Sequence, residues 1–249
     1  MKTALITGAS SGIGRATARL FAKESIRLII CGRRKDRLAE LRDELQKIVP
    51  VHVLRFDVRH KAEVFENIKH LPKEFQEIDI LVNNAGNAHG LDPIENGNTD
   101  DWDAMLDINV KGLLYVSKAV IPGMIERKKG HIINIGSTAG KEVYPNGNVY
   151  CASKHAVDAL NQGMRIDLNK YKIKVGAVNP GLTQTEFSEV RFKGDTEKAK
   201  KVYQGYKALE AEDIAEIINF MVSRPMHVNI ADLTVMPTAQ ANSTTVNKD

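Results

Sequence analysis

Short apolar runs alternate with helical segments along the entire chain, and this alternation restricts the fold more than any other feature. The runs are rich in Val, Ile and Leu and too short to be buried helices, which predicts strands. We expect these strands at Ala4–Ile6, Leu28–Cys31, His52–Phe56, Ile80–Val82, His131–Ile135, Lys174–Val178 and Leu233–Val235. The segments between them have the spacing of amphipathic helices, with expected bounds Arg15–Lys23, Arg37–Ile48, Ala62–Ile68, Asp101–Arg127, Tyr150–Leu168 and Ala211–Ser223.

Continuously apolar strands are typical of a parallel sheet that helices cover on both faces. Repeated β-α-β units with right-handed crossovers build such a sheet in a doubly wound form. The sequence therefore predicts an α/β fold of the Rossmann type, with a doubly wound seven-stranded parallel sheet and helices on both faces. We expect a single domain spanning residues 1–249, because no linker, low-complexity stretch or internal repeat divides the chain.

Two segments have neither pattern. Residues Leu182–Lys201 carry charges of both signs and are too long for an ordinary connection, so we expect an irregular substrate loop that acts as a lid or binding loop. The polar tail Ala239–Asp249 is expected either to fray or to lie across a neighbouring subunit.

Composition and charge exclude several classes of protein. With 43% hydrophobic and 27% charged residues, the chain is neither disordered nor a coiled coil, and a net charge of +4 is too small to indicate nucleic-acid binding. Residues 1–50 nevertheless hold 11 Lys and Arg against 5 Asp and Glu, a surplus of +6, while the remaining residues sum to −2. This distribution favours an anion-binding site near the N-terminus.

Hydropathy and cysteine content predict a cytoplasmic protein. No apolar run approaches the ~18 residues expected of a membrane span, and the first run stops at Thr7-Gly8, unlike a secretory leader. Cys31 and Cys151 are too few for a disulfide framework or a metal site. We therefore expect no membrane partner and no bound metal.

A glycine-rich turn, Thr7–Gly14, follows the first strand and opens the first helix. Glycines permit a tight turn and a close approach of backbone to a pyrophosphate, and a helix N-terminus attracts the anion. The position in the first β-α unit supports this interpretation over an ordinary strand-to-helix turn. The candidate cofactor-binding residues here are Gly8, Ser10, Ser11, Gly12, Ile13, Gly14 and Arg15.

The end of the second strand indicates which dinucleotide binds. An NAD site places an acidic residue about 20 positions after the glycines, but this chain has Arg33 and Arg34 there, and no carboxylate before Asp36. Guanidinium groups pair with phosphate, which favours NADP(H), with Arg15 in reach of the same 2′-phosphate. The alternative is that the arginines lie on a solvated helix start.

A Tyr150-x-x-x-Lys154 pair lies on a predicted helix, so the phenol and the ammonium share one face. Such an ammonium favours the phenolate and lowers the pKa of the tyrosine. Ser137 follows the strand ending at Ile135, at the edge of the sheet where open α/β folds bind ligands. Without other motifs, a Tyr-x-x-x-Lys pair would be no more than a spacing that occurs by chance on helices.

Together these motifs resemble the short-chain dehydrogenase/reductase family, and the resemblance spans essentially the whole chain. It rests on Thr7-Gly-x-x-x-Gly-x-Gly14, Asn83-Asn84-Ala85-Gly86, Asn109, Ser137, Tyr150-x-x-x-Lys154 and Pro180-Gly181. The segments Gly130–Gly140, Glu186–Asp195 and His227–Ile230 are similar to the NADP-dependent serine and 3-hydroxy acid dehydrogenase branch. That branch includes reductases of small acidic aldehydes such as sulfoacetaldehyde and malonic semialdehyde.

The resemblance implies a role for each matching residue. Tyr150 would be the general acid/base, Lys154 would lower its pKa and hold the nicotinamide ribose, and Ser137 would bind the substrate oxygen. Asn109 would anchor a water that relays protons from Lys154. The implied cofactor contacts are Asp57 and Val58 at the adenine, Asn84, Ala85 and Gly86 along the adenosine side, and Pro180, Gly181 and Thr185 at the nicotinamide end. Many NADP-using members have a basic residue where this chain has Ser11, so recognition of the 2′-phosphate would rest on Arg33, with Arg34 and Arg15 in support.

The expected activity is NADP-dependent hydride transfer at the hydroxyl-bearing carbon of a small 3-hydroxy acid, of the L-serine, L-allo-threonine or 3-hydroxypropanoate type, or of the corresponding acidic aldehyde or ketone. Arg191 is the candidate for binding the substrate carboxylate, with a lid or interface arginine as the alternative. The family further implies a homotetramer. A carbonyl or 3-oxoacyl-type reductase, and a non-catalytic NADP-binding regulatory protein, remain alternatives.

Overall fold

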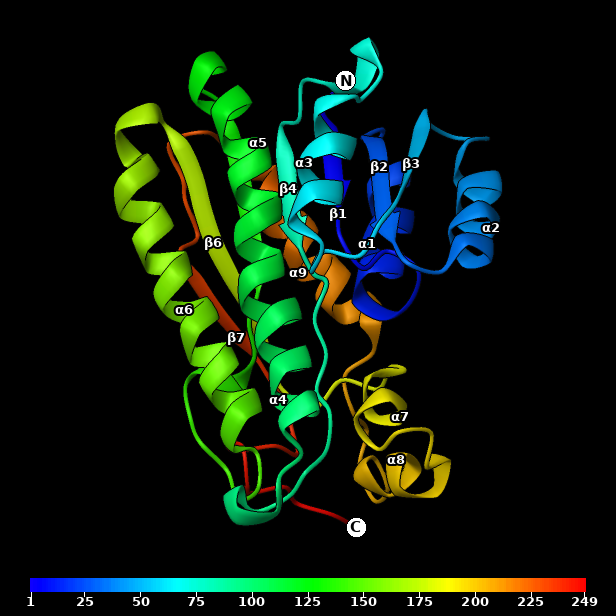
Figure 1. Ribbon diagram of the computed structural model, residues 1–249, viewed down its shortest axis with the longest axis vertical. Coiled ribbons are helices and arrows are strands. Elements are labelled where there is room, and N and C mark those ends of the chain that lie inside the picture. The colour runs from blue at the N-terminus through cyan, green and yellow to red at the C-terminus, as the bar shows by residue number, and fades with distance from the viewer.

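The computed structural model describes residues 1–249 and contains one seven-stranded sheet (Figure 1). Its strands are β1 Thr3–Ile6, β2 Arg27–Gly32, β3 Val51–Arg55, β4 Ile80–Asn83, β5 Gly130–Ile135, β6 Ile173–Pro180 and β7 Asp232–Val235. All neighbouring strands are parallel and their order is β3-β2-β1-β4-β5-β6-β7. The predicted doubly wound sheet is thus confirmed, and the order reverses between β1 and β4, where such sheets bind ligands.

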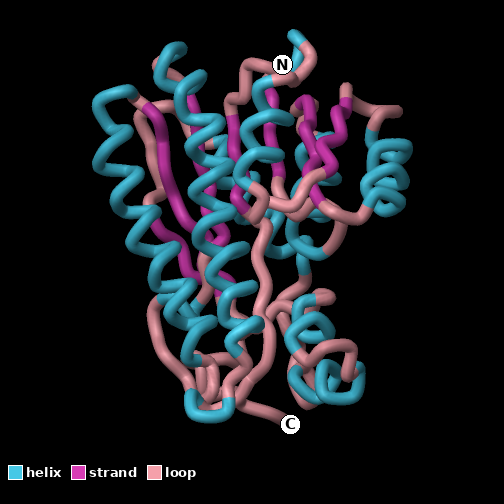
Figure 2. Tube along the Cα trace, viewed as in Figure 1, coloured by secondary structure: helices cyan, strands magenta, loops and turns pink.

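Helices cover both faces of the sheet (Figure 2). Their bounds are α1 Gly12–Lys23, α2 Lys35–Leu45, α3 Lys61–Lys69, α4 Thr99–Leu106, α5 Leu113–Arg127, α6 Asn148–Leu168, α7 Phe187–Arg191, α8 Thr196–Val202 and α9 Ala211–Ser223. Short 3₁₀ turns occupy Lys73–Phe75, Ile94–Asn96, Thr138–Gly140 and Asn169–Tyr171. The predicted helices are all present, except that one of them is divided.

Two apolar layers hold the helices to the sheet. Alternate residues of a strand point to opposite faces, so Ala4 and Ile6 of β1 join one cluster and Leu5 joins the other. The first cluster takes apolar side chains from α1, α2 and α9, and the second takes them from α3, α5 and α6. The two layers cover the faces of the sheet. The carboxyl ends of the strands lie at its edge, where a binding site can form.

The predicted helix Asp101–Arg127 is interrupted, which corrects the sequence interpretation. A π-helical turn, Asp107–Gly112, separates α4 from α5. Within it, the amide of Asn109 bonds the backbone of Asn87 and the hydroxyl of Ser153, contacts between distant segments that helical periodicity does not report.

By length and hydropathy alone, the run Thr99–Arg127 is able to span a membrane, contrary to the expectation that no segment would be. In the fold its apolar residues Val116, Val120 and Met124 are buried in the second cluster. The run is therefore packed as a core helix of this domain.

The segment Leu182–Lys201 is not irregular as expected. It begins as an extended stretch and then forms α7 and α8, which lie beyond the carboxyl ends of the strands (Figure 1). Asp195 caps α8 by accepting a hydrogen bond from Lys198 N at 3.0 Å. Both helices have seven residues or fewer, too short for periodicity to reveal, because their stability comes from tertiary contacts. We call residues 182–202 the lid.

The C-terminal tail is folded onto its own chain and is not frayed. Gln240 is buried, and its Oε1 accepts a hydrogen bond from Leu182 N at 2.8 Å. Gln240 and Val246 form an antiparallel bridge, and Asp249 N donates to Gly205 O at 2.8 Å. The tail thus braces the start of the lid.

Candidate active site

A cavity of about 490 Å³ lies at the carboxyl edge of the sheet, between the strand ends, the lid and the tail. It brings together most of the residues that the sequence selected from distant segments. Those that line it are Gly8, Ser10, Ser11, Gly12, Ile13, Arg33, Arg34, Asp57, Val58, Asn84, Ala85, Gly86, Ser137, Tyr150, Lys154, Pro180, Gly181, Thr185 and Arg191. Gly14, Arg15 and Asn109 lie outside the lining.

The glycine turn is locked by Asn84. Its Nδ2 donates to Thr7 O at 2.9 Å and to Gly8 O at 3.3 Å. A Cβ atom at Gly14 would lie 2.5 Å from that Nδ2 and 2.6 Å from Gly8 O, so only glycine fits there. Gly14 therefore shapes the turn, while Gly8 and Gly12 adopt the positive φ that glycine tolerates.

The N-terminus of α1 faces the same cavity and suits an anion. Ser11 caps the helix without a side-chain hydrogen bond to its backbone, and the first turn contains no acidic residue. The first backbone N–H groups of the helix are thus available to a pyrophosphate. This arrangement fits the pyrophosphate predicted to bind at the glycine turn.

The arginines at the end of β2 differ in their contacts. Arg33 is 60% exposed, and its nearest carboxylate oxygen, on Asp57, is 3.7 Å away. Arg34 donates to the hydroxyl groups of Ser10 and Ser11, at 2.6 to 3.1 Å, and pairs with Glu186 of the lid at 2.7 Å. These two guanidinium groups mark the cationic end of the cavity.

Arg15 does not share this end of the cavity. Its guanidinium pairs with Glu40 of α2 at 3.0 Å. We call the part of the cavity between the glycine turn and Asp57 the cofactor half. Arg33 and Arg34 line it, and Arg15 does not.

Asp57 follows β3 and is held in the ionised form. Arg59 donates to its carboxylate from the backbone N at 3.0 Å and from the guanidinium at 2.8 Å. Burial raises the pKa of Asp57, but Arg59 and the charge of Arg33 lower it more, so that the pKa lies below its usual range. The carboxylate can therefore accept hydrogen bonds from a group bound in the cavity.

Ser137, Tyr150 and Lys154 meet at the middle of the cavity. Ser137 Oγ accepts a hydrogen bond from Ala139 N at 3.1 Å, which leaves its hydroxyl hydrogen free to donate. Lys154 Nζ donates to Ile135 O at 2.9 Å and lies 5.9 Å from the centroid of the Tyr150 ring. Burial lowers the pKa of Lys154 to about 8.

Tyr150 corrects one sequence expectation. Its pKa is raised, chiefly by burial and then by Tyr144, while Ser137 and Arg191 act to lower it. The sequence predicted a lowered pKa from the ammonium of Lys154, because periodicity places the pair on one face but does not report how deeply the phenol is buried.

Asn109 acts as a brace between α6 and the loop after β4. Its Nδ2 donates to Asn87 O at 2.8 Å and to Ser153 Oγ at 3.0 Å, and its Oδ1 accepts from Asn87 N at 2.9 Å. The amide thus fixes Asn87 directly after Gly86 in the cavity wall.

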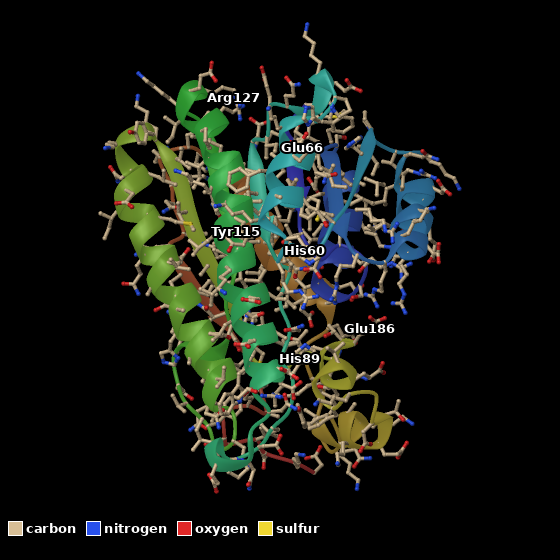
Figure 3. All side chains as sticks on the ribbon, in the orientation of Figure 1. His60, Glu66, His89, Tyr115, Arg127 and Glu186 are labelled. Atoms are coloured by element: carbon tan, nitrogen blue, oxygen red, sulfur yellow. The ribbon has the colours of Figure 1, made fainter.

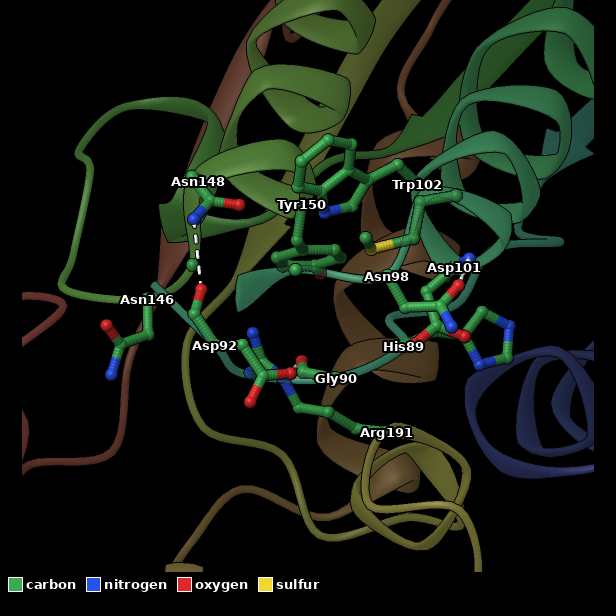
Figure 4. A pocket seen from close by; sticks show the side chains of 13 residues that line it. His89, Gly90, Asp92, Asn98, Asp101, Trp102, Asn146, Asn148, Tyr150 and Arg191 are labelled. Atoms are coloured by element: carbon green, nitrogen blue, oxygen red, sulfur yellow. Dashed lines mark hydrogen bonds between the residues drawn. The ribbon is translucent and has the colours of Figure 1, made fainter. Parts of the chain in front are cut away.

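Arg191 is the last residue of α7 in the lid, and Figure 4 shows it in a pocket that Tyr150 also lines. Its Nη2 donates to Tyr144 Oη at 2.6 Å, and its Cζ is 5.3 Å from the centroid of the Tyr150 ring. No Asp or Glu oxygen lies within 4.0 Å of its guanidinium. A half-buried cation without an ion-pair partner therefore faces the Tyr150 ring.

We call the part of the cavity around Tyr150 and the lid the substrate half. Several residues that line it were not predicted from the sequence. They are Tyr144, Phe187, Tyr203, Gln240 and Ser243, all of which line the cavity. Tyr144 lies six positions before Tyr150, and an aromatic residue at that spacing is only a weak signal of a site. Gln240 and Ser243 come from the polar tail, whose composition gives no indication of its packing.

The fold and this constellation define a class of enzyme. The family model for short chain dehydrogenases matches residues 2–196, so the chain belongs to the short-chain dehydrogenase family and is an oxidoreductase.

Individual relatives indicate which members of the family this chain is similar to. NADP-dependent 3-hydroxy acid dehydrogenase YdfG of Escherichia coli (strain K12) is 46% identical over 238 residues, which cover 95% of each chain. Sulfoacetaldehyde reductase 2 of Chromohalobacter salexigens is 44% identical over 238 residues, covering 95% of this chain and 94% of that protein. The solved structure of the closed form of serine dehydrogenase complexed with NADP+ has a TM-score of 0.93 and 45% identity, and covers 99% of each chain.

Proposed function

We propose that this chain is an NADP-dependent dehydrogenase of small 3-hydroxy acids, of the L-serine, L-allo-threonine or 3-hydroxypropanoate type. The observation that carries the proposal is Arg191, a half-buried guanidinium without a carboxylate partner, next to the Tyr150 ring. A substrate with a carboxylate near its reacting hydroxyl would supply the missing anion. Relatives with 3-hydroxy acid and serine dehydrogenase names support the same substrate class.

The cofactor half suits NADP(H), because its strand end carries arginines and lacks the acidic residue of an NAD site. Ser10 and Ser11 accept hydrogen bonds from Arg34 and keep their own hydroxyl hydrogens for a phosphate. The residues that would hold the cofactor are Gly8, Ser10, Ser11, Gly12, Ile13, Arg33, Arg34, Asp57, Val58, Asn84, Ala85, Gly86, Tyr150, Lys154, Pro180, Gly181 and Thr185.

The catalytic residues divide the work of the reaction. When bound, NADP supplies the hydride chemistry. In oxidation, Ser137 donates its free hydroxyl hydrogen to the substrate oxygen while Tyr150 Oη removes the hydroxyl proton. Lys154 adds positive charge on the same helix face, and Asn109 supports the wall from which a water-mediated proton path would start. In reduction, Tyr150 returns the proton.

The test is turnover with matched substrates. Purified protein with NADP should oxidise L-serine, L-allo-threonine or 3-hydroxypropanoate, followed by the absorbance of reduced nicotinamide. Arg191→Ala should raise the KM of these acids roughly ten- to hundredfold, the size of a lost charge-assisted hydrogen bond. An unchanged KM would contradict the assignment of Arg191.

Other results of these turnover measurements would favour a different function. Activity confined to neutral carbonyl compounds or 3-oxoacyl substrates would favour a reductase of those classes. Tight NADP binding without turnover of any alcohol or carbonyl would favour a regulatory protein.

A sulfonate would satisfy the same guanidinium as a carboxylate. The 44% identity with a sulfoacetaldehyde reductase makes acidic aldehydes a second substrate candidate. With NADPH, comparison of sulfoacetaldehyde and malonic semialdehyde by kcat/KM would decide between them.

We further infer a cytoplasmic homotetramer. Leu106, Leu114 and Ile166 are exposed apolar residues on the α4–α5 run and on α6, helices suited to pair across subunits. Both cysteines are free and buried, as in a reducing compartment. Light scattering after size exclusion would measure the mass, and a monomer would contradict the assembly.

A further inference from the structure

Two cations lie near the Tyr150 ring, and they come from different parts of the fold. Lys154 belongs to α6, as Tyr150 does, and its Nζ lies 5.9 Å from the ring centroid. Arg191 belongs to the lid, and its Cζ lies 5.3 Å from the same centroid. The family resemblance gives the ammonium the task of favouring the phenolate, and the structure places a guanidinium at a similar distance.

We propose that Arg191 has a second task besides binding the substrate acid: it supplies positive charge that makes Tyr150 an effective base. The inference deepens the proposed function but does not depend on the substrate being an acid. It makes the lid part of the proton-transfer machinery.

The charge of Arg191 is permanent and is not neutralised by an ion pair. A guanidinium stays protonated at all working pH values, whereas Lys154, with a pKa of about 8, loses its charge in alkaline solution. Arg191 forms no ion pair, and its Nη2 and Nε donate to neutral oxygens, Tyr144 Oη at 2.6 Å and Gly90 O at 3.4 Å. Because the group is half-buried, solvent screens its field only in part.

The other groups around Tyr150 do not cancel this field. From α6 come Lys154 and Cys151, from the segment after β5 come Ser137 and Tyr144, and from α7 comes Arg191. None of these is a carboxylate. From the loop after β4 and from α4, His89, Asp92 and Asp101 line an adjoining pocket with Tyr150 and Arg191, and Asp101 is paired with Lys193 at 2.8 Å. Tyr144 and Cys151 raise the pKa of Tyr150, while Ser137 and Arg191 lower it.

The lid holds the guanidinium in place from both of its ends. At the start of α7, Glu186 pairs with Arg34 at 2.7 Å and with Arg37. Figure 3 shows Glu186 where the lid meets the cofactor half of the cavity. At its end, Arg191 O accepts a hydrogen bond from Gly90 N at 3.0 Å. The cation therefore reaches Tyr150 only when α7 is docked between these two anchors, which ties proton transfer to a covered site.

The experiment uses a substrate without a carboxylate, so that acid binding does not contribute. The pH dependence of kcat for a small neutral alcohol, at saturating NADP, is measured for the wild type, Arg191→Met and Arg191→Lys. In Arg191→Met the pKa of the acidic limb should rise by about 1, with a roughly tenfold loss of rate on that limb and recovery at high pH. Arg191→Lys should restore most of the rate.

Lys201→Met is the matched control, since Lys201 is an exposed lysine of α8 in the same lid and lies outside the cavity lining. Its profile should coincide with that of the wild type. Titration of tyrosinate absorbance, with Tyr150→Phe as the reference, reports the same pKa without turnover and remains available for a variant of low activity.

The outcomes separate this inference from the proposed function. If Arg191→Met leaves both the neutral-alcohol profile and the tyrosinate titration unchanged while the KM for 3-hydroxypropanoate rises, Arg191 binds the acid only and this inference is wrong. If the profile shifts but the KM for the acid does not, the inference stands and the carboxylate assignment fails.

Discussion

The cofactor half and the substrate half of the cavity differ in whether backbone or side chains form most of the lining. The cofactor half is mostly backbone: a turn with two glycines at positive φ, the N-terminus of α1, and strand ends held by Asn84. The substrate half is mostly side chains, with Arg191, Tyr144 and Phe187 packed around Tyr150. Backbone geometry accepts an invariant dinucleotide, whereas side chains on a lid can be exchanged to accept different substrates.

Contacts between distant segments hold both halves together, and in the cofactor half Asn84 reaches Thr7 across 77 positions. In the substrate half, Arg191 reaches Gly90 across 101 positions and Gln240 reaches Leu182 across 58. Ser137, Tyr150 and Lys154 lie where the halves meet. Substitutions in each half should therefore separate effects on NADP binding from effects on the substrate.

The largest effect is expected at the junction. Tyr150→Phe removes the phenol hydroxyl that we propose exchanges the substrate proton, so kcat should fall about 10²- to 10⁴-fold, the usual contribution of general acid–base catalysis. The affinity for NADP, measured by fluorescence titration, should change little. Tyr115→Phe, on α5 and outside the cavity, is the control and should keep full activity.

Gly14→Ala tests the claim that the cofactor half depends on backbone shape. The new Cβ would collide with Gly8 O at 2.6 Å, so the turn must shift, at a cost of roughly 1–3 kcal/mol or more. We expect a lower Tm and at least about tenfold weaker NADP binding.

Gly163→Ala is the matched substitution, because nothing lies within 4 Å of its Cβ position in α6. It should raise stability by about 0.5–1 kcal/mol, the helix preference for alanine. Equal losses in Tm for the two variants would refute the steric argument for Gly14.

Arg33→Ala tests the cationic end of the same half. Arg33 is largely exposed and only weakly paired, so its guanidinium is free for a 2′-phosphate. The KM for NADP should rise roughly ten- to hundredfold, while that for NAD stays unchanged. Arg15→Ala, whose guanidinium pairs with Glu40, should alter neither value by more than about twofold. Equal effects of Arg33→Ala on both cofactors would count against NADP selection here.

The contrast between the halves also explains what the sequence could predict. The sheet, the glycine turn and the residues Ser137, Tyr150 and Lys154 depend on short patterns with a fixed period or spacing, and the cavity contains them all. The helices of the lid, the π turn around Asn109 and the folded tail depend on contacts between distant segments. Such contacts leave no local periodicity, and burial, which raises the pKa of Tyr150, is likewise a tertiary property.

The smallest effect is expected where the halves are joined across the lid. Glu186 bridges Arg34 and Arg37, but all three side chains are one third or more exposed, so that solvent weakens the pairs to about 0.2–1 kcal/mol each. Glu186→Gln should thus raise the KM for the hydroxy acid by no more than about fivefold, by loosening α7, without weakening NADP binding, because Arg34 loses a competing anion. Glu189→Gln, on the same helix and without an ion pair, should leave both constants unchanged. If Glu186→Gln weakened NADP binding instead, Glu186 would act by orienting Arg34 in the cofactor half, and the division between the two halves would have to be redrawn at that residue.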